Sequence, residues 1–216
     1  MKTAVVTGAN GGVGHEVTRL LLADGWRVHA QYRSTPGPLE SPQLSWWQAT
    51  FPAIADAPEL SAVDALIHCA GVVSLGSVAT APLSDWEEAM QVNLYAPVAL
   101  TSHYLPALRA TGGHVVYLNS GAGLRANPHW GSYAASKFAA RAWCDALRLE
   151  ETKLRVTSIF PGRIDTQMQR TVVAAEGGTY NAEAYLSAHT VATAVLNALN
   201  TPEDGHPHEV ILRPRS

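Results

Sequence analysis

The sequence predicts an α/β protein with a doubly wound parallel sheet and helices on both faces. Short apolar runs rich in Val, Ile and Leu alternate along the chain with longer stretches of helical spacing. Such alternation is typical of right-handed strand–helix–strand units, which align strands in parallel and cover both faces of the sheet. Of the 216 residues, 47% are hydrophobic and 15% are charged, which favours a sizeable buried core and excludes a disordered chain. We expect a single domain over residues 1–216.

Seven strands and three long helices are predicted from this pattern. The strands are the apolar runs bounded by Gly, Pro or polar residues. They are Ala4–Val6, Val28–Tyr32, Leu44–Gln48, Ala65–His68, Val115–Leu118, Val156–Phe160 and Val210–Leu212. Helical spacing predicts a first helix that begins near Val13 and stops before Gly25, and two more over Trp86–Leu108 and Tyr133–Glu150. The Pro-rich segment 34–42 is predicted to be a loop, because the alternation continues past it.

Charge and cysteine content exclude several classes of partner. The net charge of −3 gives no electrostatic footprint for nucleic acid. No apolar run approaches the ~20 residues of a membrane span, and glycines interrupt the first run too early for a secretory signal. Cys69 and Cys144 are too few for a disulfide framework, and the nine histidines lack the neighbours of a metal site. We expect a cytoplasmic protein without bound nucleic acid, membrane or metal.

A glycine-rich turn joins the first strand to the first helix. It reads Thr-Gly-Ala-Asn-Gly-Gly-Val-Gly over residues 7–14. Glycines allow a tight turn and close approach of the backbone to a pyrophosphate, and the helix N-terminus offers free N–H groups to phosphate oxygens. This context predicts the dinucleotide site of a Rossmann-like fold, with a plain strand-to-helix turn as the alternative. The candidate contacts are Gly8, Asn10, Gly11, Gly12, Val13 and Gly14.

The end of the second strand predicts which nicotinamide cofactor binds. NAD sites usually carry an acidic residue about 20 residues after the glycines, where it holds the ribose hydroxyls. This chain has Arg33 and Ser34 there, and no acid. A guanidinium can pair with a 2′-phosphate through charge-assisted hydrogen bonds, so we predict NADP(H) rather than NAD(H). The alternative is that Arg33 is a solvated loop charge.

Three side chains form a candidate reactive group. Tyr133 and Lys137 are four residues apart, which places them on one face of the predicted helix. A phenol with an ordinary pKa near ~10 is a poor acid–base group at neutral pH. An adjacent ammonium, together with a positively charged oxidised nicotinamide, is expected to lower that pKa. Ser120 follows the strand Val115–Leu118, at the edge where parallel strands present ligands. Its hydroxyl is suited to polarise a substrate carbonyl.

These motifs, taken in order, resemble those of the compact, single-domain short-chain dehydrogenases/reductases. They are the glycine turn, Ser120, Tyr133-Ala-Ala-Ser-Lys137 and Pro161-Gly162, within a resemblance that spans Thr7 to about Thr166. The resemblance implies that Tyr133 is the acid/base, that Ser120 orients the carbonyl, and that Lys137 holds the nicotinamide ribose and tunes the tyrosine. It also implies a second set of cofactor contacts. These are Ala70, Gly71, Tyr133, Lys137, Pro161, Gly162, Ile164 and Thr166.

Asn93 matches the helical asparagine of this family, which implies that it belongs to the catalytic set. Pro97 lies four residues further on in the predicted helix. Because proline has no N–H, the carbonyl of Asn93 loses its helical partner, and the helix is expected to kink. The family's proton relay uses an ordered water near this asparagine and the lysine. We therefore expect a water on the freed carbonyl, with a buried structural amide beside a tolerated kink as the alternative.

Two features depart from the family's usual pattern. His68-Cys69 replaces the two amides that often brace the sheet before Ala-Gly. The glycine spacing also fits the extended members of the family, which include sugar-nucleotide epimerases. Residues 163–216 are too few for the substrate region of an extended member, so the compact type is favoured. We expect a cofactor half at about 1–110 and a catalytic and substrate half at about 111–216.

The resemblance implies an NADP(H)-dependent oxidoreductase that interconverts a carbonyl and an alcohol by hydride transfer. Two alternatives stay open: a non-catalytic NADP(H)-binding regulator, and an epimerase or dehydratase on the same scaffold. We expect a small-molecule substrate and a lid over Gln167–Leu186. The expected pocket residues are Val73, Ser74, Arg125, His129, Trp130 and Met168.

The resemblance also implies a homodimer or homotetramer formed through helices 86–108 and 133–150. The helix pattern predicts an apolar face for this contact. Its members are Ala139, Ala140, Trp143 and Leu147.

Overall fold

A seven-stranded parallel sheet organises the chain in a computed structural model that describes residues 1–215. Its strand order is β3–β2–β1–β4–β5–β6–β9, and every pairing is parallel. The strands are β1 (Thr3–Thr7), β2 (Arg27–Tyr32), β3 (Leu44–Gln48), β4 (Ala65–His68), β5 (His114–Leu118), β6 (Arg155–Pro161) and β9 (Glu209–Leu212). All seven predicted strands are confirmed.

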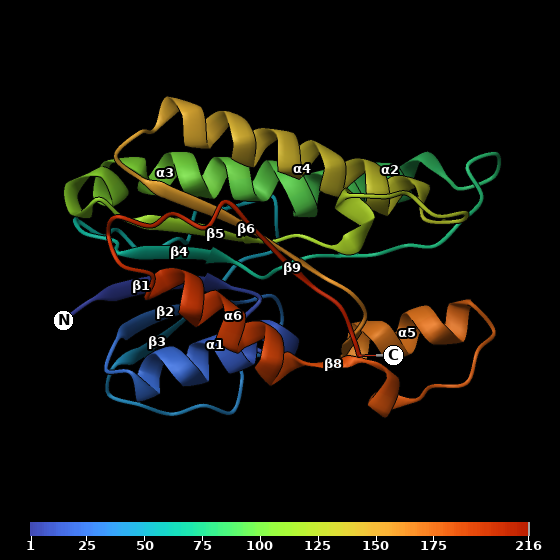
Figure 1. Cartoon of the computed structure of the whole chain (residues 1–216), viewed down its shortest axis with the longest axis horizontal. Coiled ribbons are helices and arrows are strands. Elements are labelled where there is room, and N and C mark those ends of the chain that lie inside the picture. The colour runs from blue at the N-terminus through green and yellow to red at the C-terminus, as the bar shows by residue number, and fades with distance from the viewer. Residues whose placement is uncertain (216) are drawn as a thin grey trace.

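Helices cover both faces of this sheet, which confirms the predicted doubly wound, Rossmann-like α/β fold (Figure 1). On one face, α1 (Gly12–Ala23) and α6 (Ala188–Leu199) pack against the sheet through a shared apolar core. On the other, α3 (Ala96–Thr111) and α4 (Gly131–Glu150) bury a second core. Both faces of a parallel sheet must be buried, which is why its strands have near-continuous apolar runs.

The prediction of one continuous helix over Trp86–Leu108 is wrong. It consists of α2 (Leu83–Met90), a π-helical turn η1 (Gln91–Tyr95) and α3. Pro97 lies in the first turn of α3, and the wider π turn directly precedes it. The expected local break therefore occurs, but as a π turn that contains Asn93.

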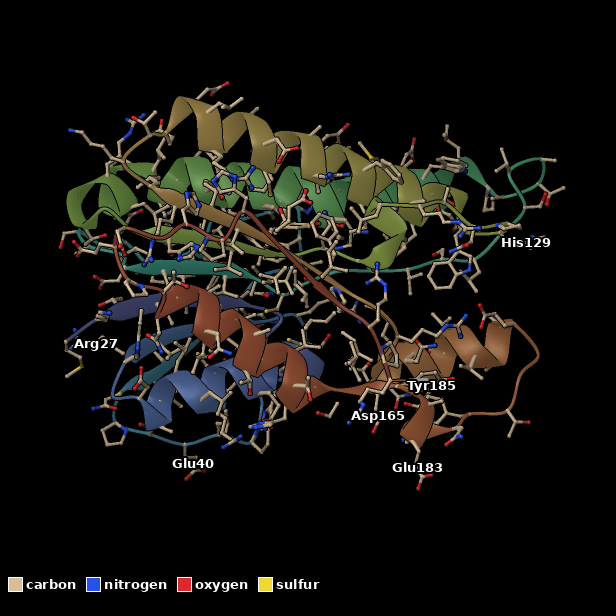
Figure 2. All side chains as sticks on the ribbon, in the orientation of Figure 1. Arg27, Glu40, His129, Asp165, Glu183 and Tyr185 are labelled. Carbon is tan, nitrogen blue, oxygen red and sulfur yellow. The ribbon has the colours of Figure 1, made fainter. Side chains whose placement is uncertain are left out.

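The sheet positions a crevice at the carboxyl ends of its strands. β1 pairs with β2 on one side and with β4 on the other. The strand order therefore reverses at β1, and in such sheets a crevice forms at the point of reversal. After β6 the chain forms a small cap at this end of the sheet, which holds most of the predicted lid. The cap contains β7 (Ile164–Asp165), α5 (Gln167–Ala175), the 3₁₀ turn η3 (Ala182–Ala184) and β8 (Leu186–Ser187). Figure 2 shows Arg27, at the start of β2, at the left end of the molecule and Asp165 of the cap well to its right.

Most of the residues predicted to form an apolar subunit contact on α4 do not face outward. Ala140 and Leu147 are buried in the chain's own core, and Trp143 packs against it. The large apolar side chains that α4 exposes are Phe138 and Leu149. Helical periodicity places these residues on a different face from the core residues. Within residues 1–215, no helix has the length and apolar character needed to cross a membrane.

Candidate active site

The glycine turn lies at the end of β1 in a conformation that only glycine adopts without strain. Gly8 and Gly12 have φ values of +61° and +52°. A Cβ atom on Gly14 would lie 2.2 Å from the Gly8 carbonyl oxygen, so the first turn of α1 packs directly on the glycine turn. Gly11 caps α1 without a side-chain hydrogen bond, and the first turn holds no acidic residue. This helix end therefore presents free N–H groups and a positive dipole to an anion.

Two polar side chains hold the turn in place. The Gly8 N–H donates to Gln31 Oε1 at 2.8 Å, and Gln31 Nε2 donates to the Ala49 carbonyl at 2.8 Å. The Thr7 hydroxyl accepts from the Ala70 N–H at 3.1 Å, which ties β1 to the segment after β4. Sequence reasoning missed the role of Gln31, because nothing local shows that a strand glutamine reaches both neighbouring segments.

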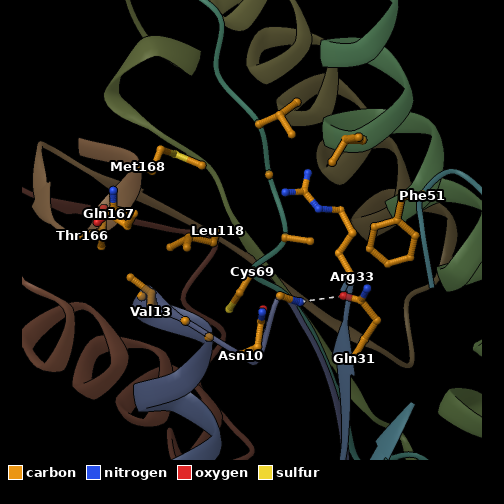
Figure 3. A pocket seen from close by; sticks show the side chains of 18 of the residues that line it. Asn10, Val13, Gln31, Arg33, Phe51, Cys69, Leu118, Thr166, Gln167 and Met168 are labelled. Carbon is orange, nitrogen blue, oxygen red and sulfur yellow. Dashed lines mark hydrogen bonds between the residues drawn. The ribbon is translucent and has the colours of Figure 1, made fainter. Parts of the chain in front are cut away.

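A cavity of about 720 Å³ extends along this turn. In Figure 3, Thr166 and Met168 lie on one side of it and Arg33 and Phe51 on the other. The cavity has on its walls every residue predicted for the adenosine and pyrophosphate part of a dinucleotide. These are Gly8, Asn10, Gly11, Gly12, Val13, Gly14, Arg33, Ser34, Ala70 and Gly71, with Ile164 and Thr166 beside them.

An adjoining cavity of about 530 Å³ contains the candidate reactive group. Ser120, Tyr133 and Lys137 line it, and Gly71 is among the residues that it shares with the first cavity. Ser120 follows β5 and caps the 3₁₀ turn η2 (Gly121–Gly123), where its Oγ accepts from the Ala122 N–H. Pro161, Gly162, Ile164 and Thr166, all predicted cofactor contacts, also line this cavity. The structure thus brings together side chains from β5, α4 and the segment after β6.

Burial is the main cause of the pKa shifts of Tyr133 and Lys137. It raises the pKa of the Tyr133 phenol, while the hydrogen bond from Ser120 lowers it. Burial lowers the pKa of Lys137 to about 7. The prediction that the Lys137 ammonium, together with an oxidised nicotinamide, lowers the pKa of Tyr133 concerns the cofactor-bound site and stays a prediction. Lys137 Nζ lies 5.8 Å from the centre of the Tyr133 ring.

Asn93 is fully buried and does not line either cavity. Its Oδ1 accepts from the Val72 N–H at 2.9 Å, and its Nδ2 donates to the Val72 carbonyl and to Ser136 Oγ. Asn93 thus braces the segment after β4 against α4. The Tyr117 hydroxyl donates to the backbone carbonyl of Asn93 at 2.6 Å and so uses one of its two lone pairs. The water that we expect on this carbonyl stays a prediction.

His68 makes a hydrogen bond in the place where the family usually has an amide side chain. Its ring is buried, and Nε2 lies 2.9 Å from the Thr101 hydroxyl of α3. Burial, with the nearby Lys137 charge, lowers the pKa of His68 to about 3. A neutral imidazole thus connects β4 to the helical layer, which answers the question raised by this departure from the family pattern.

The substrate side of the second cavity matches the prediction only in part. Val73, Trp130 and Met168 line it, whereas Ser74, Arg125 and His129 do not. Sequence reasoning missed further residues on its wall, among them Asn127, Pro128, Arg163, Gln169, Val172 and Glu176. Arg163 pairs with Glu176 through two hydrogen bonds of 2.7 Å and so ties the end of α5 to the segment after β6. These contacts depend on how the cap folds, which no local periodicity encodes.

Comparison with known proteins identifies the family. The short chain dehydrogenase family profile matches residues 2–177. The chain belongs to the short-chain dehydrogenase/reductase family. The chain is 32% identical over 238 residues to glycine betaine reductase ATRR of Emericella nidulans. This alignment covers 99% of the chain and 19% of that protein. It is 36% identical to dehydrogenase/reductase SDR family member 7B of Bos taurus over 82% of this chain and 62% of that protein.

This short-chain dehydrogenase/reductase therefore spans less than two thirds of the length of both curated relatives. Its fold is similar to that of an alcohol dehydrogenase from the archaeon Thermococcus sibiricus, solved in complex with 5-hydroxy-NADP. The TM-score is 0.83 at 23% sequence identity, and the match covers 99% of this chain and 97% of the archaeal chain. At 23% sequence identity, this similarity shows that the two chains share a fold.

Proposed function

We propose that this chain is an NADP(H)-dependent oxidoreductase that interconverts a carbonyl and an alcohol by hydride transfer, with Tyr133 as the acid/base. One observation carries the proposal: Ser120, Tyr133 and Lys137 meet on the wall of a cavity that adjoins the glycine-turn cavity. A hydride donor and a reacting carbonyl must lie within contact distance of each other, and adjoining cavities satisfy this requirement.

The residues present fit a dinucleotide with a 2′-phosphate. Gly14 has no room for a Cβ atom, and the uncapped start of α1 suits a pyrophosphate. Arg33 and Ser34 line the same cavity where an NAD site would carry an acid. Lys137, Tyr133, Pro161, Gly162, Ile164 and Thr166 would hold the nicotinamide end. The NADP derivative in the Thermococcus sibiricus enzyme supports this choice of cofactor.

The proposed mechanism assigns one task to each side chain. When bound, a nicotinamide cofactor would supply hydride-transfer chemistry to the carbonyl carbon in either direction. The Ser120 hydroxyl donates a hydrogen bond to the carbonyl oxygen and so polarises it. In reduction, the Tyr133 phenol transfers its proton to that oxygen; in oxidation, the phenolate takes the proton from the alcohol. The Lys137 ammonium stabilises the phenolate, and Asn93 positions the segments that surround the group.

Turnover separates this proposal from its alternatives. A panel of aldehydes and ketones is offered with NADPH, and the loss of NADPH absorbance is followed. We expect consumption with at least one class of carbonyl. A clean NADPH binding isotherm without consumption across the panel would favour a non-catalytic regulator. Conversion of a substrate without net cofactor consumption would favour an epimerase or dehydratase.

Arg33→Ala tests the choice of cofactor. We expect the Kd for NADPH to rise about 10–100-fold, because hydrogen bonds to charged groups contribute about 1.5–3 kcal/mol, while the Kd for NADH stays nearly unchanged. Titration of both cofactors by fluorescence measures this. Arg27→Ala is the matched control, since Arg27 is exposed at the opposite end of β2. Tighter binding of NADH than of NADPH by the unaltered protein would contradict the proposal.

Phe138→Glu tests the proposed homodimer. Phe138 is 42% exposed and Leu149 80% exposed on α4, and Tyr95 of the adjacent π turn is 53% exposed. We propose that this outward face, rather than the one predicted from the sequence, joins two copies. A buried unpaired carboxylate is costly, so the variant is expected to be a monomer by light scattering. Ile211→Glu alters an exposed apolar residue on β9, outside α4 and the π turn, and should leave the mass unchanged. A dimer that survives Phe138→Glu would exclude this face.

A further inference from the structure

Tyr117 lies at the junction of two groups that the proposed mechanism uses. Its ring is fully buried on β5, three residues before Ser120. Its hydroxyl donates to the Asn93 carbonyl at 2.6 Å and accepts from Lys137 Nζ at 3.1 Å. Lys137 Nζ also lies 4.7 Å from the centre of the Tyr117 ring. One side chain therefore contacts the ammonium through both its oxygen and its ring.

The direction of these two hydrogen bonds follows from what each group can do. A phenol has one proton, and an ammonium donates only. The Tyr117 hydroxyl donates its one hydrogen bond to the Asn93 carbonyl. Pro97, four residues further on, has no N–H to offer this carbonyl. The oxygen lone pair is therefore turned toward Lys137. Burial raises the pKa of Tyr117 well above its usual range, so the phenol keeps this proton.

The groups that surround Lys137 offer it no negative charge near neutral pH. Burial lowers the pKa of His68 to about 3, raises those of Cys69 and Cys144 to about 12, and raises that of Tyr133. All four are neutral, so the ammonium depends on dipoles. Besides the Tyr117 hydroxyl, the carbonyl of Leu118 accepts from Nζ at 2.9 Å. A buried cation held this way is sensitive to the loss of one acceptor.

We propose that Tyr117 is a positioning residue that holds the Lys137 side chain in place and keeps it charged beside Tyr133. The role rests on the proposed function, since it assumes that Tyr133 exchanges a proton with the substrate. It assigns a task to a strand residue that otherwise would only fill the core. The third N–H of Lys137 stays available for the cofactor and for Tyr133.

Tyr117→Phe removes the oxygen and keeps the ring, so core packing and the cation–π contact are retained. The chain has three lysines, Lys2, Lys137 and Lys153, and the other two are exposed. Lysine labelled with ¹³C at Cε gives three resonances to titrate by NMR. We expect the pKa of Lys137 to fall by about half a unit to one unit in the variant, because the charged form loses an acceptor. Lys2 and Lys153 should not move.

Tyr104→Phe is the matched control. Tyr104 is also a fully buried tyrosine, and its hydroxyl donates to the Pro58 carbonyl at 2.9 Å, outside both cavities. It should lower stability to a similar extent and leave the Lys137 titration unchanged. An unshifted Lys137 in Tyr117→Phe, or an equal shift in Tyr104→Phe, would overturn the proposal.

A pH profile of carbonyl reduction adds a second readout. We expect loss of the Lys137 proton to form the basic limb of kcat/KM, so this limb should move to lower pH by the same amount in Tyr117→Phe. A uniform fall in rate with an unmoved limb would indicate a merely structural residue. Because the NMR titration needs no turnover, a shifted Lys137 in a chain that reduces no carbonyl would support the role of Tyr117 and contradict the proposed function.

Discussion

Tyr133→Phe is expected to lower kcat for carbonyl reduction by about 10²–10⁴-fold, the usual contribution of a positioned acid/base. The phenol lines the second cavity and contacts the Ser120 hydroxyl. Phenylalanine keeps the ring and its edge contact with Trp130 but has no proton to give to the alkoxide oxygen. Steady-state kinetics with NADPH measure the loss. The Kd for NADPH should change far less than kcat.

Tyr104→Phe serves again as the control, because it removes a buried phenol oxygen outside the cavities. Its kcat should stay near that of the unaltered protein. Turnover near the unaltered level in Tyr133→Phe, on any carbonyl that the protein accepts, would refute the assignment of Tyr133 as the acid/base.

Gly14→Ala is expected to have the largest effect on both stability and cofactor binding. The added Cβ would lie 2.2 Å from the Gly8 carbonyl oxygen and 3.2 Å from the Ala9 Cα, both backbone atoms. Neither can rotate away, so α1 must shift from the glycine turn. Overpacking of this kind costs about 1–3 kcal/mol, and each kcal/mol lowers the Tm of a domain this size by about 2–4 °C. The displaced helix end should also abolish NADPH binding, which calorimetry measures.

Gly11→Ala is the matched control for stability. A Cβ atom on Gly11 would meet nothing within 4 Å, and its extended φ of −164° suits any residue. The Tm of this variant should therefore match that of the unaltered protein. A Gly14→Ala protein with unchanged Tm and unchanged NADPH affinity would show that α1 does not need to pack on this turn.

The strands and the glycine turn could be predicted because their signals are local. A strand such as β5 is a run of β-branched and aromatic residues, and the turn's glycines are contiguous in sequence. The pairing of Tyr133 with Lys137 was also predictable, because helical periodicity alone places residues i and i+4 on one face. Parallel strand order then brought Ser120 to the same end of the sheet.

Other parts of the site could not be predicted because they join distant segments. Gln31 bonds Gly8 and Ala49, and Arg163 pairs with Glu176 across the cap. The outward face of α4 was misassigned, since a helix with apolar residues on two faces does not show which one the sheet buries. Only the packing of α4 on the sheet placed Ala140 inside and Phe138 outside.

The sequence by itself determined the α/β fold class, the glycine turn and the choice of Ser120, Tyr133 and Lys137 as candidate site residues, since these follow from local spacing and backbone periodicity. The tertiary structure alone decided what surrounds Lys137. Tyr117 reads as a core aromatic in its strand, yet the packing of β5 against α4 and the π turn sets its oxygen between Lys137 and Asn93. The physical reason is that the partner of a polar atom depends on contacts between residues far apart in the chain, which no local pattern specifies.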